Sequence, residues 1–203
     1  MYKKIENKET LKEWLNYELY EIYGKKQTIK CFLVDFFKLS EASILRKHIR
    51  LLRMTEYYIN SNKKIRALIY SCRLRKFQNK YAIHVPPNTC GKGLHLMHVG
   101  PILFNGKAKV GENCTFHINT ALVAGGTNDG TPMLGNNIIL GVGAVVVGGV
   151  TIADGVAVGA NALVNRDVSE INITVAGVPA RKVSDKGRLD WNRRNKEGKA
   201  NSV

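Results

Sequence analysis

Residues 134–164 read LGNNII LGVGAV VVGGVT IADGVA VGANAL V, which is five six-residue units and the start of another. Each unit begins with an apolar residue, and in most units glycine or alanine follows it. A fixed short period predicts a solenoid in which each unit is a short strand and a turn, and three units close one triangular coil. The leading apolar side chain should point inward, as alternate residues of a strand do. The same spacing extends upstream to these apolar leads: Cys90, Leu96, Ile102, Val110, Phe116 and Leu122.

The repeat is interrupted at two places. Ala108 and Lys109 add two residues before Val110, and residues 123–133, VAGGTNDGTPM, separate Leu122 from Leu134. The second insertion is rich in turn-forming residues, which predicts a loop that leaves the coil. Because loops on a rigid scaffold often carry functional groups, we expect this loop to contribute to a site.

Three runs of the repeat resemble a known family: GKGLHLMHVG at 91–100, VGEN at 110–113 and AGVPARKV at 176–183. They are similar to the hexapeptide-repeat acyltransferases, most closely to the serine O-acetyltransferase branch and, within it, to capsule and glycan O-acetyltransferases. The resemblance implies a mainly β protein: a left-handed parallel β-helix behind an α-helical N-terminal domain. It also implies a homotrimer with sites between subunits and acetyl-CoA as co-substrate. We expect the helical domain over 1–80, the β-helix over 81–183 and a basic polar tail over 184–203.

Charge is concentrated outside the repeat. The chain has 203 residues and a formal net charge of +15, of which 1–80 carry +11, 81–180 carry −1 and 181–203 carry +5. A neutral solenoid argues against a nucleic-acid groove along the coils. Basic flanks suit an anionic membrane surface, a lipid-linked glycan or the CoA phosphates, or they keep a trimer soluble by repulsion. The cysteines are scattered and form no CxxC pair, which predicts reduced thiols. The sequence shows neither an apolar run long enough to cross a bilayer nor a secretory signal, so we expect a cytoplasmic protein. The inner face of the membrane is a further candidate location.

The first 80 residues show helical patterns. A Thr10–Glu13 capping box predicts a helix from Thr10 to about Gly24, and an apolar stretch predicts a short helix over 29–37. Ser40 should cap a longer helix that ends at the Ser61–Asn62 break and has Arg46, Lys47, Arg50 and Arg53 on a basic face. The last helix should run from Ile65 to Phe77 and bury Ile65, Leu68, Ile69 and Cys72. Such basic helices either pack on the solenoid with a solvated face, which we favour, or lie on an anionic membrane.

Histidines of the repeat are candidates for the base that O-acetylation requires. The resemblance assigns His98 as the catalytic general base. His117 lies one coil further on and should stack near Met97, beside His98, where it could bind the acceptor or polarise a carbonyl. His95 should face another way. The spacing does not fit the intersubunit zinc site of related β-helices, so no metal is expected.

Departures from the serine acetyltransferase pattern bear on the acceptor. Ile83 stands where that family has the aspartate that holds its histidine, and Met97 replaces an aspartate that helps to bind serine. The loop at 123–133 also lacks the Arg–His pair for the serine carboxylate. A site without these charges favours a sugar hydroxyl of a polysaccharide or glycan precursor. The candidate acceptor-site residues are Met97, Asn105, His117, Asn119 and Asn128.

The donor side keeps the family pattern. Acetyl-CoA should lie in the groove between two solenoids, with small residues near its pantetheine and cations near its phosphates. The candidate residues are Gly125, Gly126, Val142, Ala160, Arg181 and Lys182. The main interpretation is therefore an acetyl-CoA-dependent glycan O-acetyltransferase. The alternatives are an L-serine O-acetyltransferase of cysteine biosynthesis and a non-catalytic trimeric glycan-binding scaffold.

Overall fold

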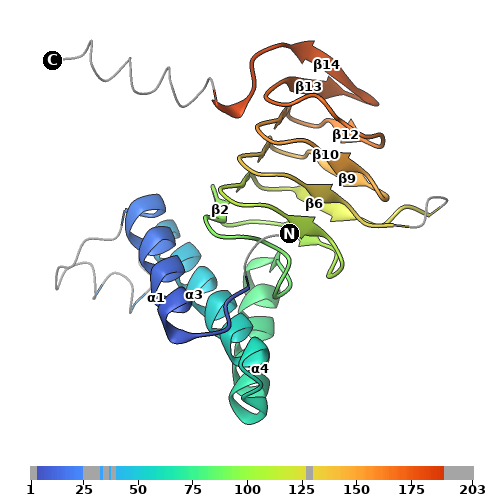
Figure 1. The fold of residues 1–203 in the computed structure, drawn as a ribbon. Coiled ribbons are helices and arrows are strands. Elements are labelled where there is room, and N and C mark those ends of the chain that lie inside the picture. The colour runs from blue at the N-terminus through green and yellow to red at the C-terminus, as the bar shows by residue number, and fades with distance from the viewer. Residues whose placement is uncertain (1–3, 25–32, 34–36, 38–39, 127–129, 190–203) are drawn as a thin grey trace, which may run out of the picture.

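The computed structural model describes residues 4–24, 33, 37, 40–126 and 130–189. Helices gather at one end of a stack of short-stranded coils, and the chain climbs the stack toward its C-terminus (Figure 1). The short helix predicted over 29–37 falls almost entirely outside the described residues. No helix in the described ranges has the length and apolar character needed to cross a bilayer.

The coils form the three faces of a prism, each a parallel sheet with one strand per turn of the chain. Sheet 1 consists of β1 (Ile83–His84), β3 (Ile102–Phe104), β6 (Thr120–Val123), β9 (Val145–Val147) and β12 (Leu163–Val164). Sheet 2 consists of β4 (Lys109–Val110), β7 (Met133–Leu134) and β10 (Thr151–Ile152). Sheet 3 consists of β2 (His95–Leu96), β5 (Thr115–Phe116), β8 (Ile139–Leu140), β11 (Ala157–Val158), β13 (Thr174–Gly177) and the antiparallel β14 (Ala180–Ser184). This arrangement is a parallel β-helix.

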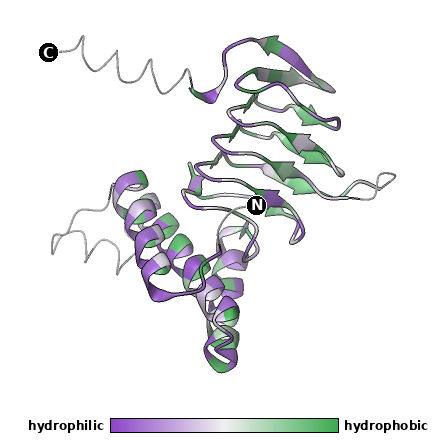
Figure 2. Cartoon of the chain, in the orientation of Figure 1, coloured by the Kyte–Doolittle hydropathy of each residue, from purple (hydrophilic) through white to green (hydrophobic). Residues whose placement is uncertain are grey.

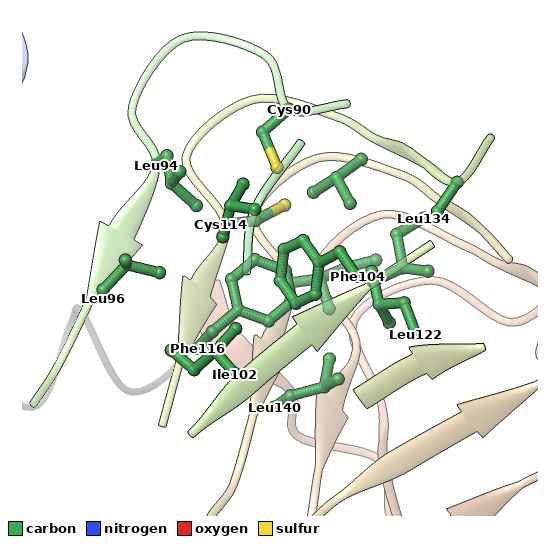
Figure 3. Packing of buried hydrophobic residues seen from close by; sticks show 14 of the residues in the cluster. Cys90, Leu94, Leu96, Ile102, Phe104, Cys114, Phe116, Leu122, Leu134 and Leu140 are labelled. Atoms are coloured by element: carbon green, nitrogen blue, oxygen red, sulfur yellow. The ribbon is translucent and has the colours of Figure 1, made fainter. Parts of the chain in front are cut away.

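The apolar leads of the six-residue units fill the prism. All twelve are at most 5% exposed, and Figure 3 shows several of them converging from the three faces. Phe104 and Phe116 meet edge to face with their ring centroids 4.7 Å apart. Each such buried side chain stabilises the fold by roughly 1.5–3 kcal/mol. The predicted inward orientation of the leads is confirmed.

A column of glycines explains why small residues follow the leads. A Cβ on Gly91 would lie 2.9 Å from the Gly111 carbonyl oxygen, and one on Gly111 would lie 2.5 Å from that of Gly135. Larger side chains at these positions would push successive coils apart. Along the coils, hydrophobic strands alternate with more polar turns (Figure 2).

The helical part contains α1 (Lys8–Asn16), the π-helical η1 (Tyr17–Ile22), α3 (Glu41–Asn60) and α4 (Lys64–Tyr81). The start predicted at Thr10 is wrong, because the Asn7 carboxamide caps the helix by accepting from the Thr10 N–H at 2.8 Å. The predicted Ser40 cap is confirmed, as is the break after α3, where Asn62 adopts φ 56°.

The basic face predicted for α3 is partly wrong. Arg53 is fully buried and Arg46 is 7% exposed, because both guanidiniums face the rest of the molecule. Arg53 donates to Glu18 at 2.6 and 3.0 Å, to Glu56 at 2.9 Å, and to the Cys90 and Gly91 carbonyls at 3.0 and 2.7 Å. This cluster joins the helices to the first coil.

The face predicted to be buried on α4 is also wrong. Ile65, Leu68 and Ile69 are 78%, 67% and 49% exposed, and Cys72 is exposed as well. The residues that α4 buries lie further along, at Leu74, Phe77 and Gln78. α4 packs inward through its opposite side, where Ala67 and Tyr70 in its first half also contact buried residues, so the predicted face presents an apolar strip to solvent.

Candidate active site

His98 lies at the corner of the prism between sheet 3 and sheet 1. It follows β2 in the turn at 97–101, and its side chain is 53% exposed. The carboxylate of Glu41 reaches it from the first turn of α3, with Glu41 Oε2 3.2 Å from His98 Nδ1. The other oxygen, Oε1, accepts from the Val99 N–H at 2.7 Å. The hydrogen bond from Val99, with a further contribution from His98, holds the pKa of Glu41 below its ordinary value, so this carboxylate is ionised near neutral pH.

The same corner recurs in every coil, and we call it the His98 corner. It comprises the turns at 97–101, 117–119, 141–144 and 159–162, which connect strands of sheet 3 to strands of sheet 1. Since Phe116, Leu140 and Val158 are paired in register, Ile118, Val142 and Ala160 stack in a column. The turn at 97–101 is two residues longer, so Gly100 lies against Ile118 and His98 stands in the extra length of that turn. The candidate base and two donor-side candidates therefore lie along one edge.

His117 lies beside His98, as the repeat predicts. Their ring centroids are 6.4 Å apart. Partial burial, and then the charges of His98 and Arg188, lower the pKa of His117. A mostly neutral imidazole at this position can donate a hydrogen bond to a substrate oxygen.

His95 points away from His98 and packs against Tyr23, with ring centroids 5.4 Å apart. Burial, followed by the charge of Arg188 and that of His117, lowers the pKa of His95 to about 4. This ring is therefore neutral at physiological pH.

Arg188 brings a cation to this region and was not singled out from the sequence, where it falls in the predicted tail. Its backbone N–H donates to the Gly155 carbonyl at 2.8 Å, and the Leu189 N–H donates to the Asn172 side chain at 3.1 Å. These bonds hold residues 187–189 against the turns that precede β11 and β13 of sheet 3. The nearest signal in the sequence is the AGVPARKV run, which precedes this segment but does not reveal its path.

The acceptor candidates divide between two corners. Met97 is partly buried next to His98, and Asn119 is exposed in the next turn of the same corner, with φ 62°. Asn105 instead follows β3 at the far end of sheet 1, where its side chain accepts from the Lys107 N–H at 2.9 Å. Asn128 lies outside the described residues. One chain does not bring Asn105 to His98.

The donor candidates divide in the same way. Val142 is 40% exposed and Ala160 is exposed, both on the His98 corner. Gly125 and Gly126 follow β6 in the loop before β7, at the corner that holds Asn105 (Figure 1). We call this second corner the loop corner. Arg181 is exposed on β14, whereas Lys182 pairs with Glu170 and with Asp185 at 2.8 Å. Those carboxylates partly neutralise the Lys182 charge.

No group of three or more His, Cys, Asp or Glu side chains suited to a metal ion occurs among the residues the structure describes.

No family model matches the chain. A serine acetyltransferase of Synechococcus elongatus is 33% identical over 108 residues, which is 52% of this chain and 44% of that protein. One from Helicobacter pylori is 30% identical over 114 residues, or 55% of this chain and 66% of that protein. The matches thus span between about two fifths and two thirds of the length of these relatives.

The chain resembles the serine acetyltransferases in sequence and in fold. A solved serine acetyltransferase from Brucella abortus superposes with a TM-score of 0.66 at 20% identity, covering 89% of this chain and 71% of that one. A serine acetyltransferase in complex with CoA gives a TM-score of 0.67 at 18% identity, covering 87% and 71%. These similarities establish the predicted fold, a left-handed parallel β-helix with an N-terminal helical region.

Proposed function

We propose that this protein is an acetyl-CoA-dependent O-acetyltransferase in which His98 is the general base. Nε2 of His98 takes the proton of an acceptor hydroxyl while the hydroxyl oxygen attacks the thioester carbonyl of acetyl-CoA. The C–S bond then breaks, and the proton passes from the imidazolium to the departing CoA thiolate. The observation that carries the proposal is the His98 corner, where an exposed, carboxylate-paired histidine shares one edge of the prism with the exposed donor-side candidates Val142 and Ala160. The similarity to serine acetyltransferases, one solved with CoA, supports the same reaction.

The first test is replacement of the base. His98→Ala should lower CoA thiol release by roughly two to four orders of magnitude with the fold retained. Circular dichroism and thermal unfolding check the fold. Turnover close to that of the wild type in the purified variant would remove His98 from the mechanism.

L-serine is the first candidate acceptor. The curated relatives named above are serine acetyltransferases. A zwitterion needs an anion for its ammonium and a cation for its carboxylate. Glu41 places an ionised carboxylate beside His98, and Arg188 places a guanidinium whose charge acts on His117. The repeat positions that bind serine in the serine acetyltransferases lack these charges in this chain. Glu41 and Arg188 would supply them from other segments.

A sugar hydroxyl is the second candidate, and Met97 favours it. Met97 precedes the base and is partly buried at the corner, and Ile118 lies in the next turn of the same corner, so apolar side chains lie near the base as well as Glu41 and His117. Thiol release with millimolar L-serine, compared with a panel of oligosaccharides, separates the two acceptors. Saturation by L-serine alone selects serine, and turnover only with a saccharide selects the glycan reading. Absence of turnover with every acceptor, together with saccharide binding, would favour a non-catalytic scaffold.

The proposed assembly is a homotrimer with shared sites. The predicted site residues lie on two corners of the prism separated by sheet 1, so a second copy must bring its loop corner to the His98 corner of the first. Sheet 1 also presents an apolar outer row, in which Leu103, Ala121, Val145 and Leu163 are paired in register. The equivalent row of sheet 2 is more polar, and its three members, Lys109, Met133 and Thr151, are exposed. Acetyl-CoA would then lie between two prisms, against Val142, Ala160, Gly125 and Gly126, with Arg181 and Lys182 toward its phosphates.

We also propose that α4 contacts an anionic membrane surface. Its sequence KIRALIYSCRLRKFQNKY contains six Lys and Arg residues and no Asp or Glu. The exposed strip of Ile65, Leu68 and Ile69 is flanked by Lys64 and Arg66. Apolar side chains beside unneutralised cations fit the boundary between anionic headgroups and acyl chains. α3 is less suited to this role, because Arg46 and Arg53 are buried and only Lys47 and Arg50 of its four cations are exposed.

A further inference from the structure

The partner of the candidate base is missing from its expected place. Ile83, which occupies that position of the repeat, is fully buried in β1 and pairs with Ile102. An apolar side chain inside the prism cannot accept a hydrogen bond from an imidazole on its outside. Glu41, 57 residues before His98 in sequence, stands at His98 Nδ1 instead.

We propose that Glu41 is the positioning residue for His98, accepting its Nδ1–H and leaving Nε2 free to take the acceptor proton. The proposal rests on the proposed function, because it assigns Nε2 as the reacting atom. Neutral histidine carries its proton on either nitrogen, and the hydrogen bond at one nitrogen decides which form is populated. Glu41 stays ionised through the cycle, while the proton moves from the acceptor hydroxyl to Nε2 and then to the CoA sulfur. The carboxylate also stabilises the imidazolium formed between those steps.

The geometry holds the carboxylate from both sides. Oε2 faces the ring at 3.2 Å, and Oε1 accepts from the Val99 N–H at 2.7 Å, the backbone amide directly after His98. A carboxylate bonded to the ring and to the next peptide keeps the imidazole in one orientation. Glu41 is also the first residue of α3, where the helix dipole favours a negative charge.

The start of α3 is itself fixed. Ser40 and Ser43 form a reciprocal capping box immediately around Glu41. Further along α3, Arg46 donates to the Tyr23 carbonyl at 3.2 Å, and the Tyr23 hydroxyl bonds to both backbone groups of Leu96 in β2. The helix that carries the carboxylate is therefore tied to the strand that precedes His98. Neither element alone could hold the pair in register.

The experiment compares Glu41→Ala and Glu41→Gln with Glu9→Ala, an exposed carboxylate in the first turn of α1 that serves as the matched control. The full-length protein is labelled with ¹⁵N-histidine, and the ring signals of His98 are assigned by their loss in His98→Gln. Spectra are recorded at about pH 8.5, well above the ordinary histidine pKa, so that tautomers of the neutral ring are compared. The kcat and the KM for acetyl-CoA are measured on the same preparations.

The wild type and the Glu9 variant should show His98 protonated at Nδ1, and Glu41→Ala should shift the proton toward Nε2. The kcat of Glu41→Ala should fall by roughly 10- to 1,000-fold with little change in the KM for acetyl-CoA, because positioning of the base acts in the transition state. Glu41→Gln should recover part of both readouts, since its amide oxygen can still accept from Nδ1–H.

An unchanged His98 tautomer in Glu41→Ala, or a kcat equal to that of the wild type while His98→Ala is inactive, would overturn the proposal. A tautomer shift in a protein that transfers no acetyl group to any acceptor would support the pairing and overturn the proposed function instead.

Discussion

The burial of Arg53 depends on residues that are distant from it in sequence. In sequence it is one of four cations on α3, yet its guanidinium is fully buried and forms ion pairs with Glu18 and Glu56. Glu18 in turn accepts from the Gly93 and Leu94 N–H groups, at 2.9 and 3.1 Å. Burial costs each charge its hydration, and only the complete network offsets that cost.

We therefore expect Arg53→Met to destabilise the protein by about 3–5 kcal/mol, because it leaves two buried carboxylates without their cation. Arg50→Met, at an exposed position of the same helix, is the control and should change stability little. Urea denaturation followed by circular dichroism measures both. Equal stability of the two variants would show that the buried pairs contribute nothing net.

His48 is the second informative residue. It is fully buried, neither ring nitrogen has a partner among the described residues, and burial followed by the Arg53 charge lowers its pKa to about 3. In the unfolded chain this histidine has an ordinary pKa of about 6.5. Between about pH 3 and pH 6.5 the unfolded chain therefore binds a proton at His48, whereas the folded chain does not. The stability contributed by the neutral ring is therefore present above about pH 6.5 and is lost as the pH falls toward 3.

From this difference, His48 should lower the free energy of unfolding by about 2 kcal/mol between pH 7 and pH 5. The variant His48→Leu should lose that part of the pH dependence. Denaturant titrations of both proteins at the two pH values test it. An identical pH dependence in wild type and variant would contradict a buried neutral histidine.

Among the elements, α4 carries apolar residues on two opposite sides. Ile65, Leu68 and Ile69 share one side, as their spacing predicts, but α4 packs on the rest of the protein through the other side, which includes Tyr70 and Leu74. Local pattern shows that such residues share a side of the helix, and it does not show whether anything covers that side.

If α4 binds membranes, replacing Ile65 and Leu68 together by glutamate should abolish co-sedimentation with vesicles that contain phosphatidylserine. Met133→Glu, which changes a similarly exposed apolar residue on sheet 2, should leave sedimentation unchanged. Wild-type protein should bind anionic vesicles more tightly than neutral ones, and less tightly as salt rises. Equal sedimentation of wild type and double variant would contradict the membrane proposal.

In the whole molecule, a single chain keeps the predicted site residues apart. His98 and the loop corner lie at opposite ends of sheet 1, and the sheet between them is apolar on its outside. A closed trimer would cover this apolar face, and it would also bring the loop corner of one copy to the His98 corner of the next.

Leu103→Glu should therefore break the assembly, because it places a charge in the covered row at a large apolar side chain that is 53% exposed in the single chain. Light scattering at low micromolar concentration should give about three chain masses for the wild type and about one for the variant. Thr151→Glu, on the polar outer row of sheet 2, is the control and should remain assembled. Full activity from a monomeric Leu103→Glu protein would exclude a shared site.

The β-helix and its core could be predicted from the sequence, because each coil is built from contacts that repeat every six residues. Every apolar lead from Cys90 to Val164 is buried. The same period places His117 beside His98 and identifies the loop before β7. The insertion predicted at Ala108 and Lys109 is wrong, because Phe104 rather than Ile102 pairs with Leu122, so the two extra residues lie in the turn at 97–101. The roles of these residues, and the limits of the domains, remain predictions.

Only the tertiary structure decided what surrounds His98. Glu41 and Arg188 reach the His98 corner and its neighbourhood from segments 57 residues before and 90 residues after the histidine, and no local period links them to it. The burial of Arg53 and the exposure of Leu68 depend likewise on how helices dock on the first coil. A repeat determines its own geometry because neighbouring units make the same contacts, whereas the charge at a site depends on contacts between segments that are distant in sequence.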